Sequence, residues 1–278
     1  MRRAINLTVQ EAQKKENVFT LGPIIHNPQE VKRLADLGVT LINAIDHFVD
    51  GTVIIRTHGI SPQEYARLEK SCNKIIDGTC PLVKRSHMVV EKLKEEGYRI
   101  IIVGDSKHPE IIALQGYAGP NTLVIKDKTE LDGIPLGGKV GVIAQTTLSK
   151  EIVQEILASL TTKVIELKYI NTLCGITLNQ KKSASQLAKD ADIILVVGGK
   201  NSSNTTKLAE ICKNIQKNTY LIESSEEIKS HWFHPDDVVG ITAGASTPQW
   251  VLQDVVDAVE KISLQFCERS EFQYVTYK

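Results

Sequence analysis

The fold of this chain is decided by residues 77–110, which read DGTCPLVKRSHMVVEKLKEEGYRIIIVGDSKHPE. The stretch starts at the end of an apolar run and places Cys80 directly before a segment with helical spacing. A second apolar run, residues 99–103, ends in a polar loop that carries His108. Strand, helix, strand and loop in this order are typical of an α/β fold with parallel sheets.

The same layout returns further along the chain. Residues 168–173 lead to Cys174, a helical segment follows, and an apolar run at residues 193–197 enters a loop with Ser202. His108 lies 28 residues after Cys80, and Ser202 lies 28 residues after Cys174. Equal spacing in two places indicates an internal repeat. We therefore expect three repeated α/β units with mostly parallel sheets, arranged as a trefoil around a central site.

The repeat predicts units at residues 1–79, 80–172 and 173–260. Counted with the same offset, the first unit lacks its N-terminal strand. The tail, residues 261–278, is polar and aromatic, which makes it a candidate to join the first unit. Further strands are predicted by short apolar runs, each followed by a polar loop and a helix, at residues 18–21, 53–57, 139–143 and 238–242.

Composition excludes several classes of protein. The 278 residues include 33 basic and 33 acidic ones, so charge favours neither a nucleic acid nor an acidic membrane as partner. No apolar run approaches the ~18 residues that a membrane span needs. No apolar segment of the kind found in signal peptides follows the basic start. We therefore expect a cytoplasmic protein whose five cysteines are thiols or ligands rather than disulfides.

Two cysteines have the position of metal ligands. Cys80 and Cys174 each lie between a strand end and a helix start, where the helix N–H groups stabilise a thiolate. A single cysteine in this position is more often a small buried residue. Because two repeats place a cysteine alike, we interpret this pair as ligands. Buried structural roles are expected for the other three, which share no such setting: Cys72, Cys212 and Cys267.

Polar side chains follow the carboxyl ends of the predicted strands, where parallel sheets bind ligands. Imidazoles, hydroxyls and amides beside helix N-termini suit phosphate or diphosphate oxygens. Ordinary helix caps remain an alternative for each loop taken singly. Neither a P-loop nor a dinucleotide-binding fingerprint occurs. The candidate anion-binding residues are His26, His58, His108, Thr146, Ser202, Ser203, Asn204 and Ser246.

Glu110 lies two residues after His108, at the start of a predicted helix. A carboxyl group buried beside negative charge keeps its proton more strongly and can deliver it to a substrate. Equally, a glutamate in a first helical turn can simply complement the helix dipole. The residues alone leave both interpretations open.

Taken together, these motifs resemble the LytB family of 4-hydroxy-3-methylbut-2-enyl diphosphate reductases, which act in the non-mevalonate pathway of isoprene biosynthesis. The similarity runs through nearly the whole chain in order. Its matching stretches are LGPIIHNP (21–28), RTHG (56–59), GTCP (78–81), HPE (108–110), AQTT (144–147), GKNSSN (199–204) and TAGAS (242–246).

The resemblance implies an oxidoreductase built as a trefoil around a [4Fe–4S] cluster. It makes Cys80 and Cys174 cluster ligands, makes Glu110 the proton donor, and makes the candidate anion-binding residues substrate contacts. The reaction implied is a reductive dehydroxylation that gives isopentenyl and dimethylallyl diphosphates. Its electrons come from an external donor such as ferredoxin or flavodoxin, because the chain shows no flavin or nicotinamide fingerprint.

Two other functions remain open at this point. One is a diphosphate-binding protein without a cluster, and the other is a zinc hydrolase, although no close zinc-ligand pair such as C-x₂-C occurs. A third cluster cysteine, placed by the 28-residue offset from His26, would lie before Met1. We therefore expect the chain to be truncated at its N-terminus, with loss of one strand of the first unit and of this cysteine.

Overall fold

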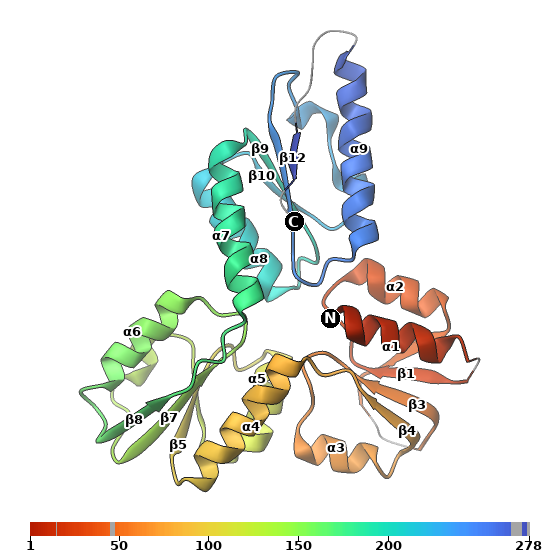
Figure 1. Cartoon of the computed structure of the whole chain (residues 1–278). Helices are drawn as coiled ribbons and strands as arrows, with labels where there is room; N and C mark the ends of the chain where they lie inside the picture. Colours follow the sequence, from red (N-terminus) through yellow and green to blue (C-terminus); the bar gives the residue numbers. More distant parts are fainter. Residues whose placement is uncertain (15, 45–47, 268–273, 277–278) are drawn as a thin grey trace. The chain divides into compact units, whose positions relative to one another are not determined.

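The computed structural model describes residues 1–14, 16–44, 48–267 and 274–276. These residues form three four-stranded sheets in which all paired strands run parallel (Figure 1). The predicted α/β class and the three repeated sheets are confirmed. Among the described residues, no helix is both long and apolar enough to cross a membrane.

The first sheet has the strand order β2-β1-β3-β4. Val53 and Ile55 of its third strand point toward helix α3 and pack there with Leu68. Helix α3 begins at Pro62, where proline is preorganised for a first turn, and Ser61 caps it through a capping box with Glu64. The elements of this repeat are α1 (Arg2–Ala12), β1 (Val18–Leu21), α2 (Pro28–Asp36), β2 (Val39–Ile42), β3 (Val49–Ile55), α3 (Pro62–Leu68) and β4 (Cys72–Asp77).

The second sheet has the order β6-β5-β7-β8 and is covered on both faces. Ile101 and Val103 of β5 pack against α6, while Ile100 and Ile102 pack against α4 and α5. A strand buried on both faces is expected to be apolar throughout, and β5 reads RIIIV. The elements are α4 (Pro81–Glu95), β5 (Arg99–Val103), α5 (Pro109–Ala118), β6 (Leu123–Ile125), the 3₁₀ helix η1 (Lys128–Leu131), β7 (Lys139–Ala144), α6 (Lys150–Leu160) and β8 (Glu166–Tyr169).

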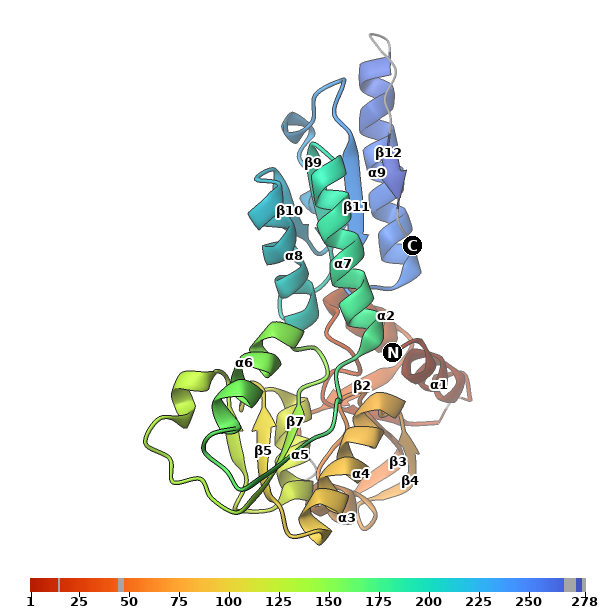
Figure 2. The ribbon, with the colours of Figure 1, turned by 60° about the vertical axis from the view of Figure 1, so that its left-hand side comes forward.

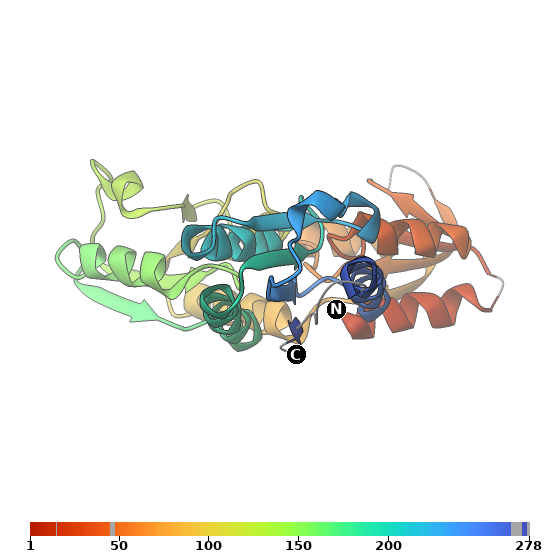
Figure 3. The ribbon, with the colours of Figure 1, turned by 90° about the horizontal axis from the view of Figure 1, so that it is seen from above.

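The third sheet repeats the arrangement with the order β10-β9-β11-β12. Its central strand β9 is fully buried: Ile194 and Val196 pack with α7 and α8, and Leu195 packs with α9 on the other face. Figure 2 shows the sheet between these helices, and Figure 3 shows α9 nearly end-on. The elements are α7 (Gly175–Asp190), β9 (Ile193–Val197), α8 (Ser203–Ile215), β10 (Thr219–Ile222), η2 (Ser225–Glu227), η3 (Ser230–Trp232), β11 (Val239–Ala243), α9 (Gln249–Cys267) and β12 (Tyr274–Thr276).

The strand pairing corrects one expectation, the placement of the tail, and shows how the repeats follow each other. Strand β4 leads to Cys80 and β8 leads to Cys174, so each cysteine is preceded by the strand that closes the previous sheet. The first sheet has four strands, like the other two; the expected loss of an N-terminal strand and of a third cluster cysteine stays a prediction. The tail does not join the first sheet, because β12 pairs with β11 of the third sheet. Residues 268–273 and 277–278 lie outside the described part of the chain.

Contacts divide the chain into two compact units. The larger unit consists of Arg3–Ile24 and Leu37–Cys174 and contains the first two sheets. The smaller unit consists of Met1–Arg2, Ile25–Asp36 and Gly175–Lys278 and contains the third sheet. Helix α2 thus belongs to the smaller unit, although it connects β1 to β2 in sequence.

Candidate functional site

The residues predicted to carry chemistry all lie in loops after the carboxyl ends of strands or in the first turn of the helix that follows. They fall into two groups, one in each compact unit. The Glu110 group, in the larger unit, consists of His58, Cys80, His108, Glu110, Thr146 and Cys174. The Ser202 group, in the smaller unit, consists of His26, Ser202, Ser203, Asn204 and Ser246.

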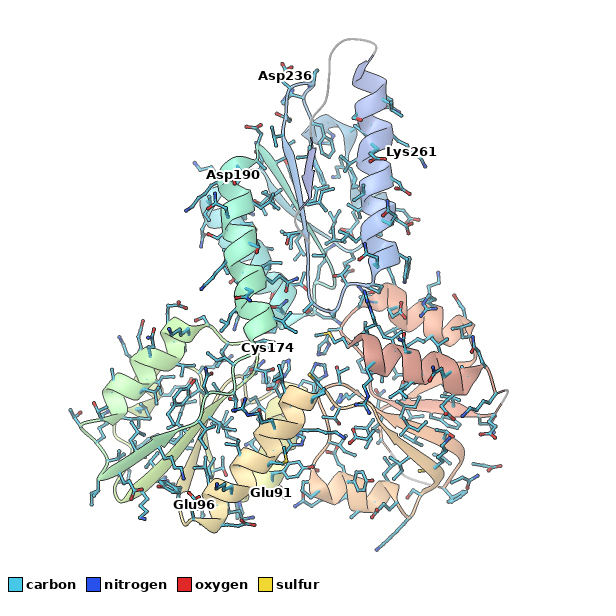
Figure 4. The ribbon with its side chains drawn as sticks, in the orientation of Figure 1. Glu91, Glu96, Cys174, Asp190, Asp236 and Lys261 are labelled. Carbon is cyan, nitrogen blue, oxygen red and sulfur yellow. The ribbon has the colours of Figure 1, made fainter. Side chains whose placement is uncertain are left out.

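The two cysteines are held in the same way in two repeats. Cys80 is the N-cap of α4, and its backbone N–H donates to the carbonyl of Thr57 at 3.0 Å. Cys174 directly precedes α7, and its N–H donates to the carbonyl of Thr146 at 2.8 Å. Figure 4 shows Cys174 beside the first turn of α7. Both residues are half-buried, so each thiol lies at a helix N-terminus in a position suited to metal ligation.

Glu110 is a buried acid with a defined partner. Its side chain is 1% exposed. The backbone N–H of Thr146 donates to one carboxyl oxygen at 2.8 Å, and the Thr146 hydroxyl donates to the other at 2.8 Å. Burial raises the pKa of Glu110 to about 7, although these two hydrogen bonds work in the opposite direction. A carboxyl group that titrates near neutral pH is suited to donate a proton.

Two histidines lie next to this acid in the larger unit. His108 is the N-cap of α5, and its Nδ1 accepts a hydrogen bond from the N–H of Glu110 at 3.2 Å. The ring of His58, from the loop after β3, meets the His108 ring edge-on with centroids 5.3 Å apart. The structure therefore brings His58, His108, Glu110 and Thr146 together from three different strand-end loops.

The Ser202 group presents neutral donors instead of an acid. Ser202 is buried and caps α8, where its Oγ accepts a hydrogen bond from the N–H of Thr205 at 3.4 Å. Asn204 is also buried and donates from Nδ2 to Gln180 at 3.1 Å. Its Oδ1 is buried without a hydrogen-bond partner among the described residues. Ser203, half-buried, is the first residue of α8.

His26 and Ser246 pack against the same loop. The Ser246 hydroxyl donates to the carbonyl of His26 at 3.3 Å. Gly199 approaches that carbonyl so closely that a Cβ at this position would lie 2.5 Å from the oxygen. Asn27 caps α2 by accepting from the N–H of Glu30 at 2.9 Å. The loops after β9 and β11 are thus tied to the start of α2.

Arg56 opens the RTHG motif (56–59) and is a functional candidate that its residue type alone did not reveal. Its half-buried guanidinium lies against Gly22, which has φ +71°. A Cβ on Gly22 would lie 2.6 Å from Nη1. Burial lowers the pKa of Arg56, yet a guanidinium stays charged. The signal in the sequence was its place two residues before His58, at the end of β3.

The remaining cysteines have no comparable setting. Burial raises the pKa of the Cys212 thiol to about 11, and its Sγ lies 3.7 Å from the carbonyl of Ala184 within the core. Cys72 is half-buried in β4, and burial raises its pKa as well. Both are suited to packing rather than ligation. The side chain of Cys267 lies outside the described residues.

Known proteins match this chain over most of its length. The sequence profile of the family described as LytB protein matches residues 1–260. The 4-hydroxy-3-methylbut-2-enyl diphosphate reductase of Campylobacter concisus is 42% identical over 264 residues, covering 94% of this chain and 95% of the relative. The reductase of the same name from Pelobacter propionicus is 38% identical over 263 residues, covering 95% and 94%.

Solved structures agree with these relatives. A structure of (E)-4-hydroxy-3-methyl-but-2-enyl diphosphate reductase, described as the terminal enzyme of the non-mevalonate pathway, is 40% identical and covers 94% of each chain with a TM-score of 0.70. The Plasmodium falciparum E-1-hydroxy-2-methyl-but-2-enyl-4-diphosphate reductase is 27% identical. It matches with a TM-score of 0.86 over 99% of this chain and 87% of that one. The chain belongs to the LytB protein family.

Proposed function

We propose that this chain is a 4-hydroxy-3-methylbut-2-enyl diphosphate reductase. The reaction removes the allylic hydroxyl of the substrate with two electrons and two protons. The C–O bond breaks, the hydroxyl leaves as water, and a C–H bond forms to give isopentenyl or dimethylallyl diphosphate. The observation that carries the proposal is the buried Glu110 carboxyl, which bonds Thr146 while the carbonyl of Thr146 holds the candidate ligand Cys174.

Cys80 and Cys174 are proposed to be two ligands of a [4Fe–4S] cluster. Soft thiolates are the ligands that such clusters take, and both residues lie at helix N-termini with their amides held by equivalent threonine carbonyls. When bound, the cluster would supply the electrons and act as a Lewis acid toward the hydroxyl. The electrons must reach it from an external donor of the ferredoxin or flavodoxin class.

Glu110 is assigned the proton transfer. With a pKa of about 7, the carboxyl group holds a proton in a large fraction of molecules at neutral pH. That proton would pass to the leaving hydroxyl, which departs as water. The Thr146 N–H and hydroxyl would then stabilise the carboxylate that remains, because they already bond its two oxygens.

The diphosphate is assigned to the histidines and to the Ser202 group. His58 lies in the loop between β3 and α3, His108 lies at the start of α5, and Ser202, Ser203 and Asn204 lie at the start of α8. Helix N-termini and neutral donors favour phosphate oxygens. The assigned substrate contacts are His26, His58, His108, Thr146, Ser202, Ser203, Asn204 and Ser246.

The test is to purify the protein without oxygen and to measure iron, sulfide and the visible absorption spectrum. We expect bound iron and sulfide in equal amounts and a charge-transfer band. The Cys174→Ala variant should lose most of the iron, whereas Cys212→Ala, a control that alters a buried thiol in the core, should retain it. Stoichiometric zinc without sulfide in the wild type would contradict the proposal.

A further inference from the structure

The Gly-rich loop that carries Ser202 donates hydrogen bonds to two carboxylates. The backbone N–H of Lys200 donates to Glu223 at 2.7 Å. The ammonium of Lys200 donates to Glu227 at 2.6 Å. Glu227 in turn accepts a hydrogen bond from the N–H of Glu223 at 3.0 Å. Both acids come from the segment that follows β10, so the loop after β9 is fixed to its neighbour.

The same segment also reaches the start of α2. Gln29 donates from Nε2 to the carbonyl of Glu223 at 2.8 Å. Gln29 follows His26 by three residues and lies in the first turn of α2. Glu223 therefore contacts the Lys200 turn through its side chain and the His26 segment through its backbone. Loss of this network would loosen two loops of the Ser202 group together.

Charge alone gives no reason for two carboxylates beside an anion-binding loop. A carboxylate near an anion site repels the anion and weakens its binding. The Lys200 ammonium offsets part of this repulsion. Burial alone would raise the pKa of Glu227, but the hydrogen bonds from the Lys200 ammonium and from the Glu223 N–H lower it. What these two acids contribute is the set of hydrogen bonds that fixes the loop.

We propose that Glu223 and Glu227 are positioning residues for the diphosphate-binding loop. They hold the Lys200–Ser202 turn in the shape in which Ser202 and Asn204 meet the anion, and Glu223 couples that shape to His26. Neither acid touches the substrate. This inference rests on the proposed function of the Ser202 group as a diphosphate site.

The experiment compares Glu227→Ala with Glu226→Ala, using inorganic diphosphate as the probe in isothermal titration calorimetry. Glu226 is a matched control because it is the preceding residue of η2, is exposed, and makes no hydrogen bond or ion pair with another described residue. Removing Glu227 should weaken diphosphate binding about tenfold. Removing Glu226 should leave it unchanged or strengthen it slightly, because only a negative charge is lost.

Two further measurements separate positioning from general instability. In Glu227→Ala the KM for substrate should rise while kcat and iron content stay near wild type, and Glu227→Gln should restore part of the affinity because its amide oxygen can still accept one bond. Equal or tighter diphosphate binding in Glu227→Ala would overturn the inference. If wild-type protein binds diphosphate but reduces no substrate, the proposed function fails while the comparison of the two variants still tests the positioning role.

Discussion

The starts of α5 and α8 occupy the same place in two repeats, yet they carry different chemistry. Each follows the first strand of its sheet, and each is capped by a side chain that accepts a backbone N–H, His108 in one and Ser202 in the other. Two residues after the cap, α5 has Glu110 and α8 has Asn204. Both side chains are buried, so the difference between them lies in their functional groups and partners.

The partners explain this difference. Glu110 turns toward the loop of the neighbouring strand and bonds Thr146, whose carbonyl also holds Cys174. Asn204 turns toward the preceding helix α7 and bonds Gln180. One position is thereby linked to a candidate metal ligand and can supply a proton. The other can only donate or accept hydrogen bonds. The repeat provides one scaffold for both positions, and we propose that the change from carboxyl to amide separates proton transfer from anion binding.

The largest effect is expected from Glu110→Gln, which makes the first loop chemically like the second. An amide keeps the shape but cannot deliver the proton, so kcat should fall by about 10²–10⁴-fold. Diphosphate affinity should stay within about threefold, since Glu110 is not assigned to the anion. Single-turnover kinetics and calorimetry measure the two quantities. Glu151→Gln is the control, because Glu151 is an exposed first-turn acid of α6; near-normal turnover in Glu110→Gln would reduce Glu110 to a structural role.

The next effect tests whether both caps bind the anion. His108→Ala and Ser202→Ala each remove a polar group assigned to diphosphate, which should cost about 1.5–3 kcal/mol of binding, or about 10–150-fold in Kd. Iron content should not change, since neither residue is assigned as a ligand. Loss of iron with unchanged substrate affinity in either variant would show that the assignment is wrong.

The pH dependence sharpens the same contrast. Because burial raises the pKa of Glu110 to about 7, the proton is present below pH 7, and kcat should fall up to tenfold per pH unit above it. The free energy of unfolding depends on pH with the same sign, because the folded state keeps a proton on Glu110 that the unfolded chain loses near pH 4.5. Stability is therefore lost as the pH rises from about 4.5 to 7, by about 3 kcal/mol at 1.4 kcal/mol per pKa unit.

Glu110→Gln should remove both dependences, because its amide does not titrate. Urea unfolding without oxygen at pH 5 and pH 8, in wild type and variant, measures the stability difference. The raised pKa would be contradicted if the stability of Glu110→Gln relative to wild type were no greater at pH 8 than at pH 5.

The smallest effect is expected at a cap that belongs to neither group. Ser61 forms a capping box with Glu64 at the start of α3. Ser61→Ala should lower the free energy of unfolding by about 1 kcal/mol and leave the Kd for diphosphate unchanged. It thus serves as the control for Ser202→Ala, since both variants lose a cap. Weaker diphosphate binding in Ser61→Ala would mean that loss of any cap, rather than loss of a ligand, disturbs the site.

Much of the fold could be predicted because the central strands are apolar throughout. The runs at residues 99–103 and 193–197 coincide with β5 and β9. The second strands β2, β6 and β10 were not predicted, since they are short and half-buried, and their patterns resemble loops. The last strand, β12, was expected in the first unit but pairs with β11 of the third sheet, because sequence spacing gives the order of strands but not the edge to which each one pairs.

The site was predictable to the level of its loops. Caps such as Asn27 and Ser202 follow from local chemistry, because their partners lie three residues away. The Glu110–Thr146 pair joins residues 36 positions apart, and no local pattern indicates it. The sequence therefore left the role of Glu110 open. Its burial and its partner in another loop favour the acid over a residue that only complements the helix dipole.

The central claim is that this chain reduces the allylic diphosphate and that Glu110 supplies a proton for the step. The most direct test incubates the anaerobically purified wild type and Glu110→Gln with 4-hydroxy-3-methylbut-2-enyl diphosphate and a chemical one-electron reductant. Products are then quantified by mass spectrometry. We predict isopentenyl and dimethylallyl diphosphates from the wild type, and at least a hundredfold less from the variant at equal iron content. An iron-loaded wild type that binds the substrate and forms neither product would contradict the account.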